Sequence, residues 1–229
     1  MDAADRQLIT RAAPLLALSL AASVLGLLLF YWLAEEVFSG ELQSFDFAVR
    51  LAVHQHASPG LTRIMSFVSW LGSAAVLAPA VLLIAALFFF LRWRRAAAWM
   101  LISMLGAVAL EITLKWAFHR PRPPAFFGTL PPSFSFPSGH ALSSFCFYGV
   151  LAGLLSRRIR GHAKHAALWA VAATMVTITG LSRIYLGVHW PTDVIAGYCA
   201  AAVWVSGLLA ADRWRLHRKT RKTANQVPS

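Results

Sequence analysis

Three short polar clusters interrupt an otherwise apolar chain, and each lies at the end of a long apolar segment. The first cluster runs from Lys115 to Pro123, the second from Pro137 to His140, and the third from Ser182 to Asp193. Their candidate residues for chemistry are three cations, two histidines and one aspartate: Lys115, Arg122, Arg183, His140, His189 and Asp193. Cations bind phosphate oxygens, and an imidazole can act as a nucleophile or transfer a proton. The clusters therefore predict a phosphate-binding site with its own nucleophile and acid.

The third cluster combines a histidine and a carboxylate at the start of a predicted helix. Pro191 suits the first turn of a helix, which places His189 just outside the helix and Asp193 about one turn inside it. A carboxylate at this spacing can hold one imidazole nitrogen and leave the other free to attack. Arg183 ends the preceding apolar segment and can cover the same pocket. The alternative is an interfacial histidine beside an aspartate that only compensates the helix dipole.

The second cluster predicts a turn that leads into a helix. Ser138 and Gly139 offer a hydroxyl group and free backbone N–H groups at the helix N-terminus, where anions bind favourably. His140 would then lie beside a bound phosphate, in a position to protonate a leaving oxygen. The alternative is an ordinary serine cap with a neighbouring histidine.

The first cluster brings two long cations to the end of an apolar segment. Lys115 and Arg122 are candidate phosphate ligands, although cations at a membrane surface often only extend towards water. Glu111 precedes Lys115 by four residues, so the two can pair on one helix face. Because an acid within an apolar span is costly, we expect Glu111 to orient Lys115; a purely structural contact is the alternative. The spacing of His119 and Arg120 assigns them no role.

The composition is that of an integral membrane protein. Hydrophobic residues make up 58% of the 229 residues, only 13% are charged, and the mean hydropathy is +0.61, whereas soluble domains are rarely so apolar. The net charge of +12 does not predict nucleic-acid binding, because Lys and Arg collect on the cytoplasmic side of membrane proteins. We expect one all-α membrane domain over residues 1–229, with no nucleic-acid partner and no obligate protein partner.

Six apolar segments are long enough to cross a bilayer, which takes about 20 residues. The predicted transmembrane helices, arranged as a bundle, cover residues 12–33, 73–91, 97–117, 140–156, 166–187 and 191–211. A basic tail follows over residues 212–229. Most Lys and Arg residues lie at the N-terminus, between spans two and three, between spans four and five, or after span six. The positive-inside rule therefore places both termini in the cytoplasm and all three clusters on the opposite face.

The long connection over residues 35–72 lies on the same face as the clusters. It is expected to form two short interfacial helices, near Phe45–Val53 and Leu61–Leu71, separated at Ser58, Pro59 and Gly60. Their expected role is lateral: they would shape a lipid entrance or pack on the rim of the bundle.

Taken in order, the clusters match the patterns K-x6-RP, PSGH and SR-x5-H-x3-D over residues 115–193. This arrangement resembles the type 2 phosphatidic acid phosphatase superfamily, with all three signature motifs complete, and the six spans extend the likeness to nearly the whole chain. The resemblance implies a helical bundle that works without a metal or other cofactor. It also implies a set of residues that hold the phosphoryl oxygens, namely Lys115, Arg122, Arg183, Ser138 and the Gly139 amide.

The resemblance further implies roles for the remaining polar residues. His189 would attack phosphorus and form a phosphohistidine, and Asp193 would orient His189. His140 would donate a proton to the leaving group and then activate the hydrolytic water. Clustered positive charge and an in-line nucleophile are what phosphoryl transfer needs, so the residues taken on their own chemistry favour the same conclusion.

The expected function is hydrolysis of a lipid phosphate or diphosphate in a bacterial inner membrane, at a periplasmic or extracellular site. The resemblance to small bacterial members of the family, rather than any residue of this chain, ranks undecaprenyl diphosphate first among the expected substrates, followed by phosphatidylglycerophosphate and phosphatidic acid. One alternative is a lipid phosphotransferase or lipid A phosphatase that uses the same site. Another is a transporter or lipid-binding protein, which would not need the histidines. Four phenylalanines between the first two clusters are expected to line a lipid path or lie in the interface: Phe126, Phe127, Phe134 and Phe136.

Overall fold

The computed structural model describes residues 3–224, with side chains for residues 17–215, and this part of the chain is helical without any strand. A π-helical turn, Phe145–Gly149, joins α6 and α7 into one span. The α-helices are α1 (Ala3–Ser39), α2 (Gln43–His54), α3 (Pro59–Leu71), α4 (Ala74–Phe90), α5 (Arg94–Phe118), α6 (Gly139–Ser144), α7 (Val150–Ser156), α8 (His162–Tyr185) and α9 (Pro191–Ala224).

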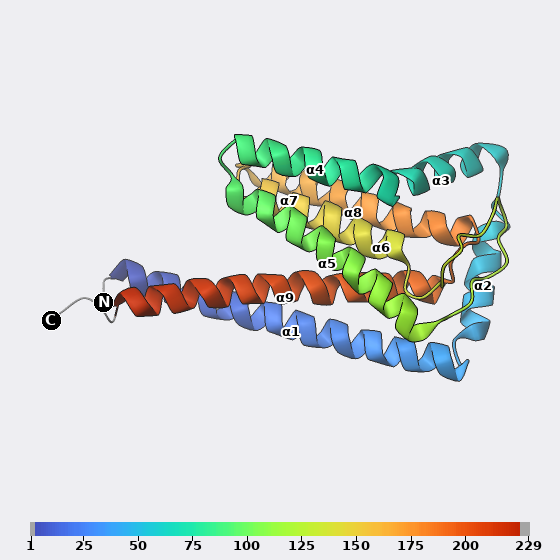
Figure 1. Cartoon of the computed structure of the whole chain (residues 1–229), viewed down its shortest axis with the longest axis horizontal. Helices are drawn as coiled ribbons and strands as arrows, with labels where there is room; N and C mark the ends of the chain where they lie inside the picture. The colour runs from blue at the N-terminus through green and yellow to red at the C-terminus, as the bar shows by residue number, and fades with distance from the viewer. Residues whose placement is uncertain (1–2, 225–229) are drawn as a thin grey trace.

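The helices form a bundle with two different ends (Figure 1). Helix α1 packs along α9, α4 packs along α5, and α6 contacts α5, α8 and α9. The start of α1 and the end of α9 lie at one end, where both extend beyond the other helices. Helix α2 crosses the opposite end, close to the irregular segment 119–138. The three polar clusters therefore end up near α2.

Among residues 3–224, five continuous helical segments are long and apolar enough to span a membrane, and they correspond to the predicted spans one, three, four, five and six. The second predicted span is α4, which has only 17 residues and passes the same test together with α3, across a bend of 46°. Outward side chains such as Leu83, Phe90 and Leu105 are largely exposed in the isolated chain. Since α-helices satisfy their own backbone hydrogen bonds, such helices are stable with an apolar surface facing lipid. The protein is thus an all-α integral membrane protein, as predicted.

The centre of the bundle is packed with small and medium apolar side chains. Met100, Ala107, Leu142 and Cys146 have no exposed surface, and they come from α5, α6 and the π-helical turn. Small residues let membrane helices approach closely, because packing rather than the hydrophobic effect holds them together in lipid. This core fixes α6, whose first residues belong to the second polar cluster.

The connection between α1 and α4 contains the two expected short helices, and both of them contact the bundle. Both helices exist close to their predicted positions, as α2 and α3. Helix α3 packs on α8, where the Tyr185 hydroxyl group lies 2.8 Å from Thr62 Oγ1. Helix α2 directs two charged side chains, Asp46 and Arg50, into the protein, where both are buried. The predicted basic tail lies mostly outside the described side chains, although α9 continues through Ala224.

Candidate active site

His189 and Asp193 meet at the start of α9. His189 Nδ1 lies 3.3 Å from Asp193 Oδ2, and both side chains are almost completely buried. The same Asp193 oxygen accepts the backbone N–H of Trp190 at 2.9 Å, so the carboxylate also caps the helix that begins at Pro191. The predicted contact between His189 and Asp193 is confirmed. Asp193 Oδ2 also serves the start of α9, which was the alternative role expected for this aspartate. With Nδ1–H donated to Asp193, His189 keeps the lone pair on Nε2.

Arg122 covers the Nε2 atom of His189. Its Nη1 atom lies 3.1 Å from that nitrogen and also donates to the Val188 carbonyl at 2.8 Å. The remaining nitrogens of Arg122 donate to the Ser133 carbonyl, the Ser133 hydroxyl group and the Phe134 carbonyl. The guanidinium is therefore held by backbone on two sides of the site, facing the imidazole nitrogen that carries the lone pair.

Glu111 connects the first cluster to the second. Lys115 Nζ lies 2.7 Å from Glu111 Oε1, which confirms the predicted pair on α5. The carboxylate also packs against Gly139, where a Cβ atom would lie 1.9 Å from Glu111 Oε1. A larger residue at position 139 would therefore displace the Glu111 carboxylate, which is the partner of Lys115.

Arg183, Ser138 and His140 complete the set of predicted residues. Arg183 is 8% exposed, and its Nη1 atom donates to Ser69 Oγ of α3. Ser138 caps α6, its hydroxyl group accepting the Ala141 N–H at 3.5 Å, and its backbone N–H donates to the Asp193 carbonyl at 2.9 Å. His140 lies at the first turn of α6 within the electrostatic range of His189 and Arg183. The three clusters therefore converge on one place.

The electrostatic environment keeps His189 uncharged. Burial is the main cause that lowers the pKa of His189 well below its usual value, and Arg122, Arg183 and Lys115 lower it further. These three cations are the predicted phosphate ligands, and all three lie within electrostatic range of the same imidazole. A neutral imidazole facing a group of cations is suited to meet an anionic phosphate.

Two residues of this site had no predicted role. Arg120 donates from Nη1 to Asp193 Oδ1 at 2.6 Å and from Nη2 to Asp46 Oδ2 at 2.8 Å. Asp46 is fully buried and also accepts the Thr192 backbone N–H at 2.9 Å. Sequence spacing could not reveal these contacts, because Asp46 and Arg120 are 74 residues apart. The available signal was the acid itself, in a segment expected to lie on the rim.

A pocket of about 620 Å³ opens beside Lys115. It lies between the outer face of α5, represented by Ile112 and Trp116, and the loop residues Pro132, Ser133 and Phe134. Of the four phenylalanines expected along a lipid path, Phe134 alone lines this pocket. The others have packing partners: Phe136 is fully buried, Phe126 stacks on His54, and Phe127 stacks on Tyr185.

The comparison with known proteins agrees with this geometry. A sequence profile of the PAP2 superfamily matches residues 96–216, which contain all three clusters. The chain belongs to the PAP2 superfamily. It is accordingly a lipid phosphatase, as the names of its relatives also indicate. Among the described residues, no three His, Cys, Asp or Glu side chains gather as a metal site would require.

Three relatives show how far the similarity of this PAP2 protein extends. Phosphatidylglycerophosphatase B of Bacillus subtilis (strain 168) is 33% identical over 75% of this chain and 85% of its own length. An undecaprenyl-diphosphatase of Sulfolobus acidocaldarius is 31% identical over 74% of this chain and 80% of its own. The crystal structure of a transmembrane PAP2-type phosphatidylglycerolphosphate phosphatase from Bacillus subtilis superposes with a TM-score of 0.75, at 30% identity, over 83% of this chain and 96% of the other.

Proposed function

We propose that this protein hydrolyses a lipid phosphate or diphosphate through a phosphohistidine on His189, without a metal ion. The observation that carries the proposal is the arrangement around His189: Asp193 at Nδ1, and Arg122 facing Nε2 at 3.1 Å. This places the lone pair of a neutral imidazole where Arg122 would hold a phosphoryl oxygen. Lys115 and Arg183 act on the same imidazole electrostatically, which supports their role as further phosphate ligands together with Ser138 and Gly139.

The proposed reaction has two displacements. In the first, His189 Nε2 attacks phosphorus, the bond from phosphorus to the lipid oxygen breaks, and His140 gives its proton to that oxygen. In the second, His140 takes a proton from water, the water oxygen attacks phosphorus, and the phosphorus–nitrogen bond breaks to release phosphate. Asp193 stabilises the imidazolium while the phosphoryl group is attached. Glu111 orients Lys115 in the phosphate site, because the pair is already formed at 2.7 Å.

The pocket beside Lys115 suggests how a lipid headgroup enters. Trp116 and Ile112 are 67% and 54% exposed on the outer face of α5, where hydrocarbon chains would lie. The other wall contains Ser133, which holds Arg122 at 2.9 Å. We therefore propose that the headgroup enters sideways between α5 and residues 132–134, with its acyl or prenyl chains remaining in the bilayer.

The names of the most similar relatives contribute to the proposed substrates. The two matches from Bacillus subtilis name phosphatidylglycerophosphate, and the Sulfolobus relative names undecaprenyl diphosphate. We rank phosphatidylglycerophosphate first and undecaprenyl diphosphate second, which reverses the order expected from the sequence. Phosphatidic acid is third.

The proposed orientation puts the site outside the cytoplasm of a bacterial inner membrane. The α4–α5 loop, the start of α5 and the α7–α8 loop share one end of the bundle, because their arginines lie around one pocket: Arg92, Arg94, Arg95, Arg157 and Arg158. The start of α1 and the end of α9 lie at that end too (Figure 1). By the positive-inside rule this end is cytoplasmic, which gives cytoplasmic termini and a site on the periplasmic or extracellular side.

The test is phosphate release by the purified protein in detergent with EDTA present. The three candidate lipids are offered to the parent protein, to His189→Ala and to a matched control, His162→Ala, which changes an exposed histidine of α8 away from the site. We expect release by the parent and the control, and none by His189→Ala. Release that disappears with EDTA, or that survives in His189→Ala, would contradict the proposal. Transfer of phosphate to a second lipid without release would favour the phosphotransferase alternative.

A further inference from the structure

Asp46 is a buried carboxylate that belongs to none of the three clusters. It lies on α2, has no exposed surface, and accepts three hydrogen bonds within the protein. Its Oδ1 atom accepts the Thr192 N–H at 2.9 Å, and Oδ2 lies 2.7 Å from Thr192 Oγ1 and 2.8 Å from Arg120 Nη2. A carboxylate buried this deeply is costly unless every partner is in place, so its position is fixed by its partners and fixes them in turn.

Arg120 passes this fixed position on to Asp193. Its two terminal nitrogens bridge two buried carboxylates, because Nη2 contacts Asp46 Oδ2 and Nη1 contacts Asp193 Oδ1 at 2.6 Å. Asp193 thereby uses one oxygen for Arg120 and the other for His189 Nδ1. A carboxylate held at both oxygens cannot rotate, and the imidazole that donates to it keeps one ring orientation and one tautomer.

We propose that Asp46 and Arg120 are positioning residues for the reaction: through Asp193 they hold His189 in the tautomer and orientation that direct Nε2 at phosphorus. The contacts form one chain from α2 through Arg120 and Asp193 to His189, and each contact in it is between side chains that are mostly or fully buried. This inference rests on the proposed function, since it assigns a task to the environment of the same histidine. It gives α2 a role in catalysis that acts through the orientation of His189.

A purely structural role for Asp46 would leave a different signature. Asp46 also ties α2 to the start of α9 through Thr192, and loss of that tie alone would lower stability without changing the chemical step. The two roles are separated by a double-mutant cycle, because residues that act in series through Asp193 lose their effect once Asp193 is gone.

The experiment compares kcat and KM for lipid phosphate in Asp46→Asn and Arg120→Gln, each alone and combined with Asp193→Asn. Asp46→Asn and Arg120→Gln should each lower kcat about tenfold to a hundredfold, as loss of a buried orienting partner does elsewhere, with KM changed by less than about threefold. In the Asp193→Asn protein the same changes should alter kcat by less than about threefold. Additive losses in the combined variants, or changes confined to KM, would overturn the proposal.

Two control variants guard against a general loss of structure. Thr192→Val removes the hydroxyl contacts to Asp46 and Arg120 but keeps the chain of carboxylates. If Asp46 were only a tie to α9, Asp46→Asn would behave like Thr192→Val, lowering stability and leaving kcat unchanged. We expect Thr192→Val to have clearly the smaller effect. Asp212→Asn removes a carboxylate that pairs with Arg95 at the other end of the bundle, and it should leave kcat unchanged.

A spectroscopic readout decides the proposal even if the chosen lipids are not substrates. In ¹⁵N-histidine NMR spectra, the His189 signals are identified by their absence in His189→Ala. The parent should show the Nδ1–H tautomer, and Arg120→Gln and Asp46→Asn should shift the signals towards a mixture of tautomers. An unchanged His189 tautomer in both variants would overturn the positioning role, whereas a parent with this tautomer and no phosphate release would overturn only the proposed function.

Discussion

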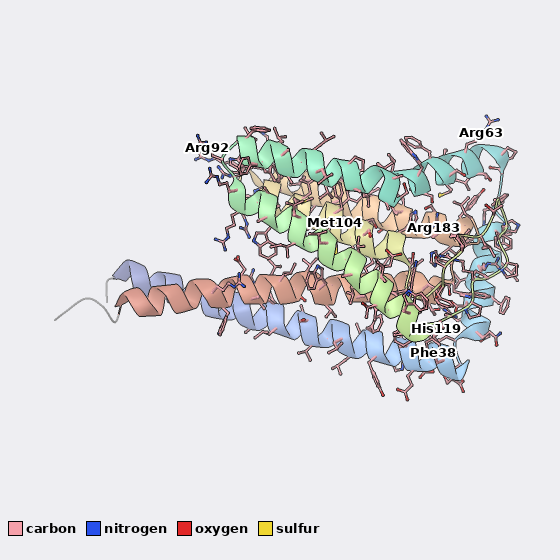
Figure 2. The ribbon with its side chains drawn as sticks, viewed as in Figure 1. Phe38, Arg63, Arg92, Met104, His119 and Arg183 are labelled. Atoms are coloured by element: carbon pink, nitrogen blue, oxygen red, sulfur yellow. The ribbon has the colours of Figure 1, made fainter. Side chains whose placement is uncertain are left out.

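The two ends of the bundle both gather arginines, but in different environments. At the end crossed by α2, Arg120 bridges two fully buried carboxylates, and Arg183 is 8% exposed. At the opposite end, four arginines at the start of α5 and in the loops beside it are exposed: Arg92, Arg94, Arg157 and Arg158. The side chain of Arg95, which pairs with Asp212 there, is 54% exposed. Figure 2 shows Arg92 at that end, away from Arg183 and His119.

The difference teaches what an arginine contributes in each setting. A buried cation must be matched by fixed partners, so it determines the positions of carboxylates and backbone around it. An exposed cation is solvated and screened, and its pairs contribute little to stability. The first end can therefore place charges for chemistry, whereas the second end is suited to setting the orientation in the membrane. Five expected results test this contrast, in order of decreasing effect.

Asp193→Asn should cause the largest change. An amide in place of the carboxylate can present a donor to His189 Nδ1 and favour the wrong tautomer, so kcat should fall about a thousandfold or more. The contact at 3.3 Å is the one removed. The assay is phosphate release in detergent, with the folded state checked by circular dichroism. A fall of less than about tenfold would mean that Asp193 serves only the helix start.

Arg120→Ala should destabilise the protein strongly. It leaves Asp46 and Asp193 as buried carboxylates without their shared cation, and breaking such a pair costs about 3–5 kcal/mol. The measurement is unfolding in detergent by heat or denaturant. If stability changed by no more than it does for an exposed arginine, the proposed distinction between the two ends would fail.

His189 should remain neutral in mildly acidic solution. Because burial and the three nearby cations lower its pKa well below the usual value, the imidazole should stay unprotonated at a pH of about 5.5, where an ordinary histidine is about tenfold more often charged than neutral. NMR titration of the signal lost in His189→Ala measures this.

The same pKa shift has a consequence for stability. In the unfolded chain His189 takes up a proton below its ordinary pKa of about 6.5, and in the folded protein it does not. Its contribution to stability is therefore complete above that pH and declines as the pH falls below it. A His189 signal that titrates near 6.5 in the folded protein would contradict both expectations.

Arg95→Ala should have the smallest effect. Its contact with Asp212 is largely exposed, so its loss should cost less than about 1 kcal/mol and leave phosphate release unchanged. The same unfolding measurement applies as for Arg120→Ala, which makes the pair a matched comparison of two Arg–Asp contacts. A large loss of stability in Arg95→Ala would show that the exposed end also depends on specific pairing.

Local spacing made part of this site predictable from sequence. The pairs Glu111–Lys115 and His189–Asp193 are each four residues apart, and both contacts are present. The helix start at Pro191 follows from the rigid proline ring. The spans were also recognisable from their apolar length, and the second of them corresponds to α4, which has 17 residues and is bent against α3.

The remaining features depend on contacts between distant segments. Arg120 was left without a role because its partners Asp46 and Asp193 are more than 70 residues away. Helix α2 was expected only to pack on the rim or shape a lipid entrance, because amphipathic spacing does not reveal that its inward side chain Asp46 pairs with Arg120. The four phenylalanines between the first two clusters were given one common role because they lie in one short segment. In the structure they differ, since Phe136 is buried in the core and Phe134 lines the pocket beside Lys115.

The central claim is that His189 carries the phosphoryl group, and trapping the intermediate tests it most directly. The purified protein is mixed with phosphatidylglycerophosphate, quenched within milliseconds to seconds, and the peptide containing His189 is analysed by mass spectrometry under conditions that preserve phosphohistidine. The account predicts phosphate on His189 during turnover in the parent and in His162→Ala, and none in His189→Ala. Steady release of phosphate in the parent, with His189 unmodified at every quench time and release intact in His189→Ala, would contradict it.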